Sequence, residues 1–141
     1  MIRPIVRDPV FLSMASAEAG SPKERAEDRR VAADLCDTLS AHADHCVGMA
    51  ANMIGVKKRI IAVSAGQVIL VLINPTVTGG FDTYEAREGC LCHEGTRAAK
   101  RYRKITVRYL SRDFRPQTGT FEGMIAQAIQ HEIDHCNGVL I

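Results

Sequence analysis

Two histidines and a glutamate near the end of the chain have the types and spacing of a metal-dependent hydrolase. His131 and His135 stand at i and i+4, so on a helix both imidazoles project from one face toward a single ion. Glu132 is offset from this pair and would reach a water beside the ion, which makes it a candidate general base. An ordinary core helix that matches the short H-E-x-x-H pattern by chance is the alternative interpretation.

The residues around this pattern predict a helix with one apolar half. That half is formed by Phe121, Met124, Ile125, Ala128, Ile129, Ile133 and Cys136. The opposite, polar half would hold Gln127, Gln130 and Asp134. Glu132 and His135 fall inside the apolar half, where an uncompensated carboxylate would cost on the order of several kcal/mol. We therefore expect a cation beside Glu132, and a bound metal ion would supply it.

A third metal ligand could come from the segment Glu88 to Gly95, which contains two thiols. Cys90 follows a glycine and is flanked by turn signals, so its thiolate could join the two histidines. Two histidines, one cysteine and one open position make the tetrahedral arrangement of a catalytic rather than a structural site. Cys92 is a second candidate, and its spacing alone does not exclude it.

The remaining pattern predicts an α+β fold of mostly antiparallel strands packed around the histidine helix. Strands are expected at 59–64, 68–73, 81–86 and 104–110, with Gly66-Gln67 as a hairpin turn. Ser21-Pro22 followed by Glu24 predicts the start of one further long N-terminal helix, which runs to about His42. The run from Cys46 to Gly55 is small and apolar, as in a ligand-binding wall or a tight packing junction.

Length, charge and cysteine content restrict the class of protein. A chain of 141 residues, 46% of them apolar, predicts one domain spanning residues 1–141. The net charge of +2 and a basic cluster at 97–104 with a single aromatic residue give little support for specific nucleic-acid binding. No export signal or membrane-length apolar run is seen, so we expect a cytoplasmic protein without a membrane partner, whose cysteines are thiols or metal ligands.

Three motifs in this order resemble those of the peptide deformylase family. The family patterns G-x-G-(L/M)-A-A-x-Q-x-G, E-G-C-(L/M)-S and Q-H-E-x-D-H correspond to Cys46 to Gly55, Glu88 to Cys92 and Gln130 to His135. Further matches are Asn74-Pro75, Gly95 with Arg97, and Gly138 after the histidines. The resemblance covers nearly the whole chain, from the first long helix to the end.

The resemblance implies a role for each matched residue. It implies that Cys90, His131 and His135 bind the metal, that Glu132 is the acid and base, and that the backbone N–H of Leu91 helps to hold the oxyanion. It implies substrate contacts from Gly48, Met49, Met53 and Gly89. It also implies that Asp134, behind the metal ligands, pairs with Arg101.

The same resemblance implies a reaction and a cofactor. Family members remove the N-formyl group from the N-terminal formylmethionine of nascent peptides, so a formylated peptide is the expected partner and the ribosome is expected nearby. They use one divalent ion, natively Fe(II), and Zn(II) or Ni(II) can replace it in purified protein because nitrogen and sulfur ligands bind these ions more tightly.

Three positions depart from the family patterns. Met53 replaces a glutamine that would donate a hydrogen bond in the transition state, Cys46 replaces a glycine, and Cys92 replaces a serine. We therefore expect weak deformylase activity, with two alternatives. The chain could be a related hydrolase with a changed acyl or amide substrate, or a non-catalytic metal-binding paralogue, although retention of Glu132 argues against the paralogue.

Overall fold

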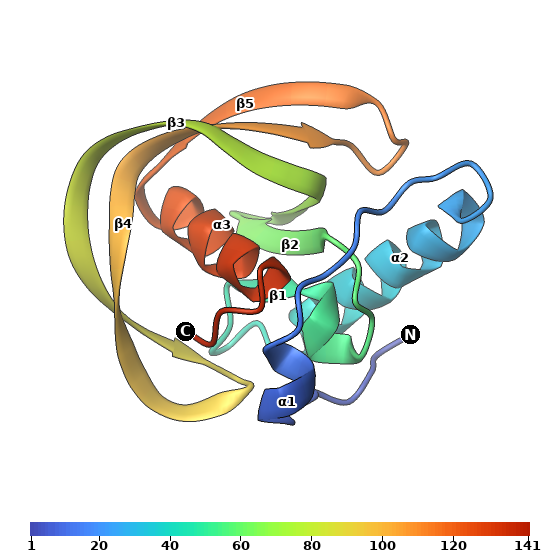
Figure 1. Ribbon diagram of the computed structural model, residues 1–141, viewed down its shortest axis with the longest axis horizontal. Helices are drawn as coiled ribbons and strands as arrows, with labels where there is room; N and C mark the ends of the chain where they lie inside the picture. Colours follow the sequence, from blue (N-terminus) through green and yellow to red (C-terminus); the bar gives the residue numbers. More distant parts are fainter.

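The computed structural model describes residues 1–141, and its central element is the C-terminal helix α3 (Gly123–Cys136). One antiparallel sheet with strand order β1-β2-β3-β4-β5 curls around this helix (Figure 1). The strands are β1 (Gly48–Ala50), β2 (Ile60–Ala65), β3 (Val68–Cys90), β4 (His93–Leu110) and β5 (Pro116–Glu122). The other helices are α1 (Pro9–Leu12), α2 (Arg25–Ala41) and the 3-10 helix η1 (Ala51–Ile54). The predicted α+β class with antiparallel strands is confirmed.

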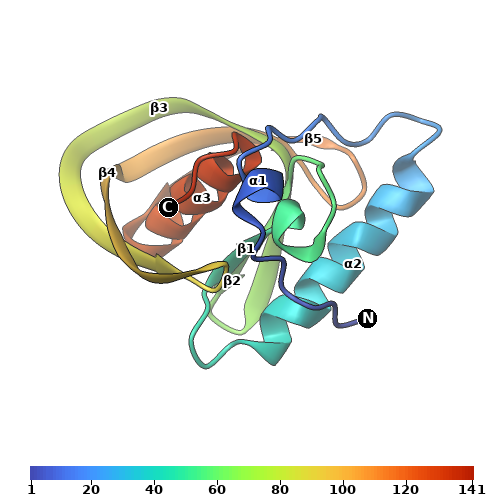
Figure 2. The same ribbon diagram turned by 60° about the horizontal axis from the view of Figure 1, so that its bottom comes forward.

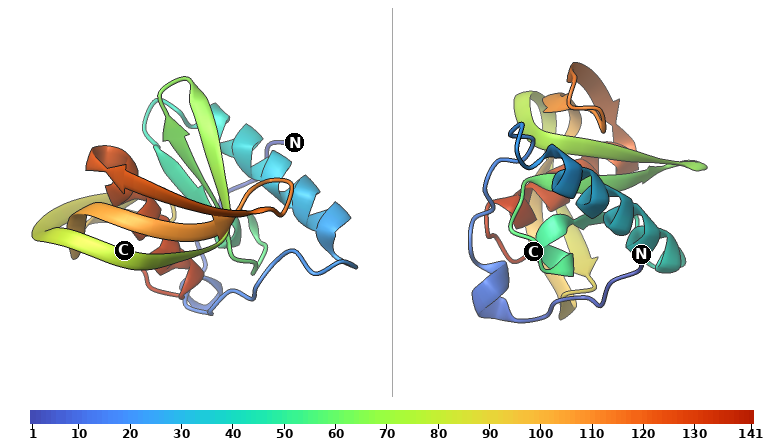
Figure 3. Two further views of the ribbon diagram at one scale, coloured as in Figure 1. Left: turned by 90° about the horizontal axis from the view of Figure 1, so that it is seen from above. Right: turned by 90° about the vertical axis from the view of Figure 1, so that its right-hand side faces the viewer.

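Strand β2 separates two apolar layers because it is buried on both faces. Ile60 and Ala62 pack toward α2, in a cluster that includes Leu35 and Leu39. Ile61 and Val63 pack toward α3, in a cluster that includes Ile129. This explains why β2 reads as a continuous apolar run rather than an alternating one. The two helices therefore lie on opposite sides of the strand (Figure 3).

Strand β3 is longer than the sequence pattern predicts, and its length lets it wrap around α3. The prediction of two separate strands at 68–73 and 81–86 is wrong, since β3 runs through Asn74-Pro75 and on to Cys90. Asn74 adopts a left-handed backbone with φ 52°, and the register with β4 shifts between Ile73 and Thr76 and again between Val77 and Gly79. Irregularities of this kind bend a strand without ending it. The bent β3–β4 hairpin encloses α3 (Figure 2).

The enclosure of α3 also changes which of its faces is buried. Gln130, predicted on a polar half, is buried, and its side-chain amide hydrogen-bonds the backbone N–H and C=O of Tyr102 on β4, both at 2.9 Å. Met124, predicted in the apolar half, is 73% exposed. The helical period is right, but β4 covers the side that a simple amphipathic helix would leave in water.

The start of α2 also differs from the prediction. The helix begins at Arg25 rather than Pro22, and Glu24 makes no side-chain cap. Its carboxylate instead accepts hydrogen bonds from the Ser21 hydroxyl at 2.9 Å and from Lys58 Nζ at 2.6 Å. The Glu24 carboxylate is thus engaged by a distant lysine instead of by the backbone at the helix start. The Gly66-Gln67 hairpin is confirmed, with Ala65 paired to Val68.

Candidate metal centre

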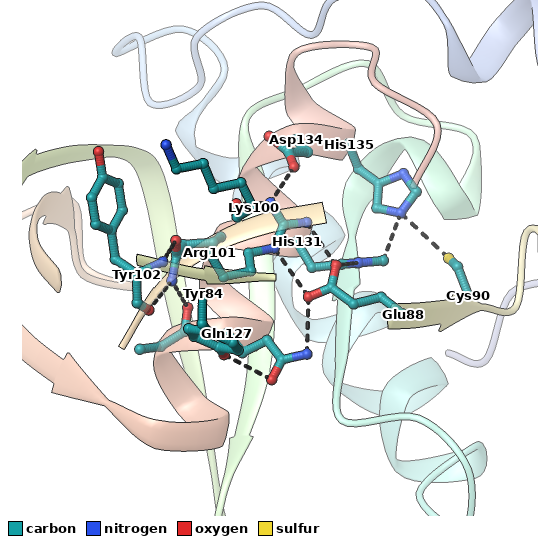
Figure 4. Close-up of polar contacts among 12 residues, drawn as sticks. Tyr84, Glu88, Cys90, Lys100, Arg101, Tyr102, Gln127, His131, Asp134 and His135 are labelled. Atoms are coloured by element: carbon teal, nitrogen blue, oxygen red, sulfur yellow. Dashed lines mark hydrogen bonds and ion pairs between the residues drawn. The ribbon is translucent and has the colours of Figure 1, made fainter. Parts of the chain in front are cut away.

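Three nitrogen and sulfur donors converge where the end of β3 meets α3. Cys90 Sγ lies 3.3 Å from His135 Nε2, which lies 3.1 Å from His131 Nε2 (Figure 4). The three side chains together place their donor atoms within 4.8 Å of one another. Both histidines are buried and Cys90 is half-buried. One Cys and two His ligands leave a fourth tetrahedral position open, as in catalytic metal sites.

The orientation of His131 is set by Glu88, the last buried carboxylate before Cys90 on β3. His131 Nδ1 lies 2.9 Å from Glu88 Oε1, and a carboxylate can only accept, so Nδ1 carries the proton. In the neutral ring, which is the form that binds a metal, the lone pair of Nε2 then faces His135 and Cys90. Metal-bound histidines are characteristically held in this way by a carboxylate on the other ring nitrogen. The donor set therefore fits a divalent ion.

Glu88 is itself fixed by Arg101 on β4. Arg101 donates from Nε and Nη2 to the two carboxylate oxygens at 3.0 and 2.7 Å, and from Nη1 to Asp134 at 2.7 Å. Gln127 Nε2 adds a further hydrogen bond to Glu88 at 2.9 Å (Figure 4). Sequence reasoning missed Glu88 and Gln127 as supporting residues. The available signal for Glu88 was its i, i+2 spacing to Cys90, which on a strand directs both side chains to one face.

The charges around the donors favour a cation. Burial opposes the charged form of His131, yet Glu132, Cys90 and Glu88 together raise the pKa of His131 to about 10. Burial likewise opposes ionisation of Glu88, but hydrogen bonds from His131 and Arg101 lower the pKa of Glu88 to about 2. The raised pKa of His131 shows that its surroundings are anionic, and the lowered pKa of Glu88 shows that this neighbouring carboxyl group is ionised. These negative charges would also stabilise a divalent cation bound by the same donors.

Glu132 lies beside the three donors, in a space that is available because residue 48 is a glycine. The side chain is buried, and its Oε1 has no hydrogen-bond partner. Burial raises the pKa of Glu132 to about 7. A Cβ on Gly48 would stand only 2.9 Å from Glu132 Oε2, so any larger residue at position 48 would displace the carboxylate. A carboxyl group that titrates near neutrality can both accept and donate a proton.

A cavity of about 550 Å³ opens onto these groups. Of the predicted substrate-contacting residues, Gly48 and Gly89 line the cavity, as does Leu91, whose backbone N–H was predicted to help hold the oxyanion. Met49 and Met53 do not line it, since both are fully buried in the cluster between α2 and the sheet. Cys92 is also buried, with its Sγ 3.1 Å from Cys90 Sγ, and it is not one of the three converging donors. The geometry thus favours Cys90 as the sulfur ligand.

Comparison with known proteins identifies the family. A sequence model described as polypeptide deformylase matches residues 2–141. The chain belongs to the peptide deformylase family. A peptide deformylase from Clostridium beijerinckii is 48% identical over 141 residues, which is the full length of both chains.

Solved deformylase structures share the fold. A peptide deformylase from Legionella pneumophila has 31% identity and a TM-score of 0.87, with 99% of this chain and 83% of that one covered. The class I type b deformylase from Acinetobacter baumannii, with Met-Ala-Ser bound, has a TM-score of 0.89 over 99% of this chain and 97% of that one. At 23% identity this second likeness concerns the fold alone. Family membership and the three converging donors together make this deformylase a metal-dependent amide hydrolase. None of its helices is long and apolar enough to span a bilayer.

We predict that replacing Cys90 with Ala abolishes stable metal binding in this deformylase, because only two donors remain. The conservative variant Cys92→Ser should keep about one metal ion per chain, since Cys92 is not among the converging donors. Elemental analysis of protein freed from loosely bound ions measures both. Full occupancy in Cys90→Ala together with metal loss in Cys92→Ser would show that Cys92 is the sulfur ligand.

Proposed function

We propose that this chain removes the N-formyl group from the N-terminal formylmethionine of nascent peptides and releases formate. The single observation that carries the proposal is the buried, unpartnered Glu132 carboxyl beside three converging metal donors, at the base of an open cavity. A purely structural metal site requires no such acid–base group. The 48% identity to a protein named peptide deformylase supports the same reaction.

Cys90, His131 and His135 would hold one divalent ion, and we propose Fe(II) as the native one. Zn(II) and Ni(II) bind nitrogen and sulfur donors more tightly than Fe(II), so they are expected to replace it during aerobic purification. The ion supplies Lewis acidity, which acidifies water and polarises a carbonyl group. Glu88 and Arg101 contribute by keeping the His131 lone pair directed at the ion.

Glu132 carries the proton through the reaction. Its carboxylate accepts a proton as water attacks the formyl carbon, and the resulting carboxyl group then donates that proton to the leaving amine. With a pKa of about 7, Glu132 is suited to both steps near neutral pH. The backbone N–H of Leu91, which lines the cavity, is proposed to donate to the oxygen that becomes negative.

The peptide is proposed to bind along β1. This strand stands at the edge of the sheet and pairs only with β2, so an extended peptide could add to its free side, beginning at Gly48. Gly89 lines the same cavity from β3, and its lack of a side chain leaves room for the peptide. Apolar side chains in the lining, Val47, Leu91, Met124 and Ala128, suit a methionine side chain. Action on nascent peptides would place the enzyme in the cytoplasm close to the ribosome.

Met53 favours a second candidate function, the hydrolysis of a different acyl or amide group. Its fully buried thioether belongs to the apolar cluster against which Cys90 and Leu91 pack, at the position where the family pattern has a glutamine. A thioether has no proton to donate, so one expected stabilising hydrogen bond is missing. The loss of such a donor typically costs about 10²–10³ in rate.

We predict that Glu132→Gln keeps the metal and the fold but lowers formate release from formyl-Met peptides by about 10²–10⁴-fold. The amide has nearly the same shape and cannot shuttle the proton. The measurement is a coupled formate assay on protein of verified metal content. Unchanged formate release in Glu132→Gln would contradict the assigned role of Glu132.

Met53→Gln should raise kcat on formyl-Met peptides by at least about tenfold, because it restores the hydrogen-bond donor that the family pattern has at this position. The matched variant Met53→Leu changes the same buried position without adding a donor and should show no gain. Both are compared with the parent at equal metal content and with the fold checked by circular dichroism. If Met53→Gln brings no gain, the missing donor does not limit the rate. Hydrolysis of a different acyl or amide group would then be the favoured function.

A further inference from the structure

A second thiol lies in contact with the metal-binding cysteine. Cys92 Sγ is 3.1 Å from Cys90 Sγ, and Leu91 and Cys92 form the turn that joins β3 to β4. A disulfide bond is about 2.05 Å long, so the two sulfur atoms need to approach by only roughly 1 Å. All five cysteines of the chain are free thiols, and Cys90 and Cys92 are the two whose sulfur atoms touch.

The two thiols differ in their access to solvent. Cys90 is half-buried and lines the cavity, whereas Cys92 is 3% exposed and does not line it. A small oxidant that enters the cavity therefore meets Cys90 first. A thiol that opens onto a cavity and contacts a second, shielded thiol has a geometry in which the second thiol can resolve the first oxidation product.

We propose that Cys92 resolves oxidised Cys90 by forming a reversible disulfide when the metal has left. Hydrogen peroxide first converts the Cys90 thiol to a sulfenic acid and is itself reduced to water. The Cys92 sulfur then attacks the Cys90 sulfur, and the S–O bond breaks as the S–S bond forms. The hydroxyl group takes up the Cys92 proton and leaves as a second water.

The disulfide has two consequences for the metal site. It takes the Cys90 sulfur from the donor set, so an ion cannot rebind through three donors until a reductant restores the thiol. It also protects Cys90 from the irreversible sulfinic and sulfonic acids, because the sulfenic acid is consumed within the protein. A bridge between residues i and i+2 closes a small, strained ring, and strained disulfides are the ones that reductants open readily.

The experiment uses full-length protein stripped of metal with a chelator and treated with a molar excess of hydrogen peroxide, enough to carry an unprotected thiol to the sulfonic acid. After alkylation of free thiols and tryptic digestion, the peptide from Glu88 to Arg97 contains both cysteines and is analysed by mass spectrometry. The expected product is this peptide two hydrogens lighter than its reduced form and without alkyl groups. Dithiothreitol should restore both thiols, and metal binding should return to about one zinc ion per chain.

Two variants separate this proposal from general oxidation of the site. In Cys92→Ser no resolving thiol remains, so Cys90 should gain two or three oxygens and metal binding should not recover with dithiothreitol. Cys46, whose thiol donates to the Gly48 carbonyl, is the other thiol of the cavity. Cys46→Ser should still form the Cys90–Cys92 bridge and recover metal binding.

The parent protein alone can overturn the proposal, whatever the variants do. Sulfinic or sulfonic acid at Cys90 with a free Cys92 would contradict it, and so would a bridge from Cys90 to Cys46. These readouts are peptide masses and metal stoichiometry, so they do not depend on which substrate the enzyme hydrolyses. A failure of the proposed deformylase reaction and a failure of this inference are therefore distinguishable.

Discussion

The buried ion pair between Glu88 and Arg101 joins β3, β4 and α3 at the metal centre. Each side chain is only 5% exposed, and Glu88 accepts hydrogen bonds from Arg101, His131 and Gln127. Loss of one partner would leave a buried charge uncompensated, at a cost of about 3–5 kcal/mol. The Glu88 carboxylate also fixes the His131 proton on Nδ1. The Glu88–Arg101 ion pair, which links β3 and β4 to α3, therefore also determines where the metal-binding lone pair of His131 Nε2 points.

The long bent hairpin makes this arrangement possible. Only a strand that bends and continues past the Asn74-Pro75 position can bring Glu88 and Cys90 back to α3, and the register shifts along β3 provide that bend. On the other side of the site, β1 approaches Glu132 so closely that position 48 has no room for a Cβ. The site is therefore built where the edge strand β1 and the far end of the β3–β4 hairpin both approach α3.

Local patterns in the sequence predicted what depends on local structure. The histidine helix, the Gly66-Gln67 turn and the antiparallel α+β class follow from residue spacing and turn chemistry. The start of α2, the continuity of β3 and the burial of Gln130 depend instead on distant partners, such as Lys58 for Glu24 and Tyr102 for Gln130. The role of Glu88 also depends on a residue distant in the sequence, because Arg101 faces Glu88 only after β3 and β4 pair. Strand β5 has a polar, glycine-containing sequence typical of an edge and carried no clear signal.

The central claim is that Glu88 prepares the metal site by orienting His131. The most direct test is the metal dissociation constant of Glu88→Gln, measured by competition with a chromophoric chelator. The amide retains the shape of the side chain but loses the charge that holds the His131 proton, so zinc should bind about 10–100-fold more weakly in a folded protein. Glu85→Gln, an exposed carboxylate on the same strand, should bind zinc like the parent. Equal zinc affinity in Glu88→Gln and the parent would contradict the account.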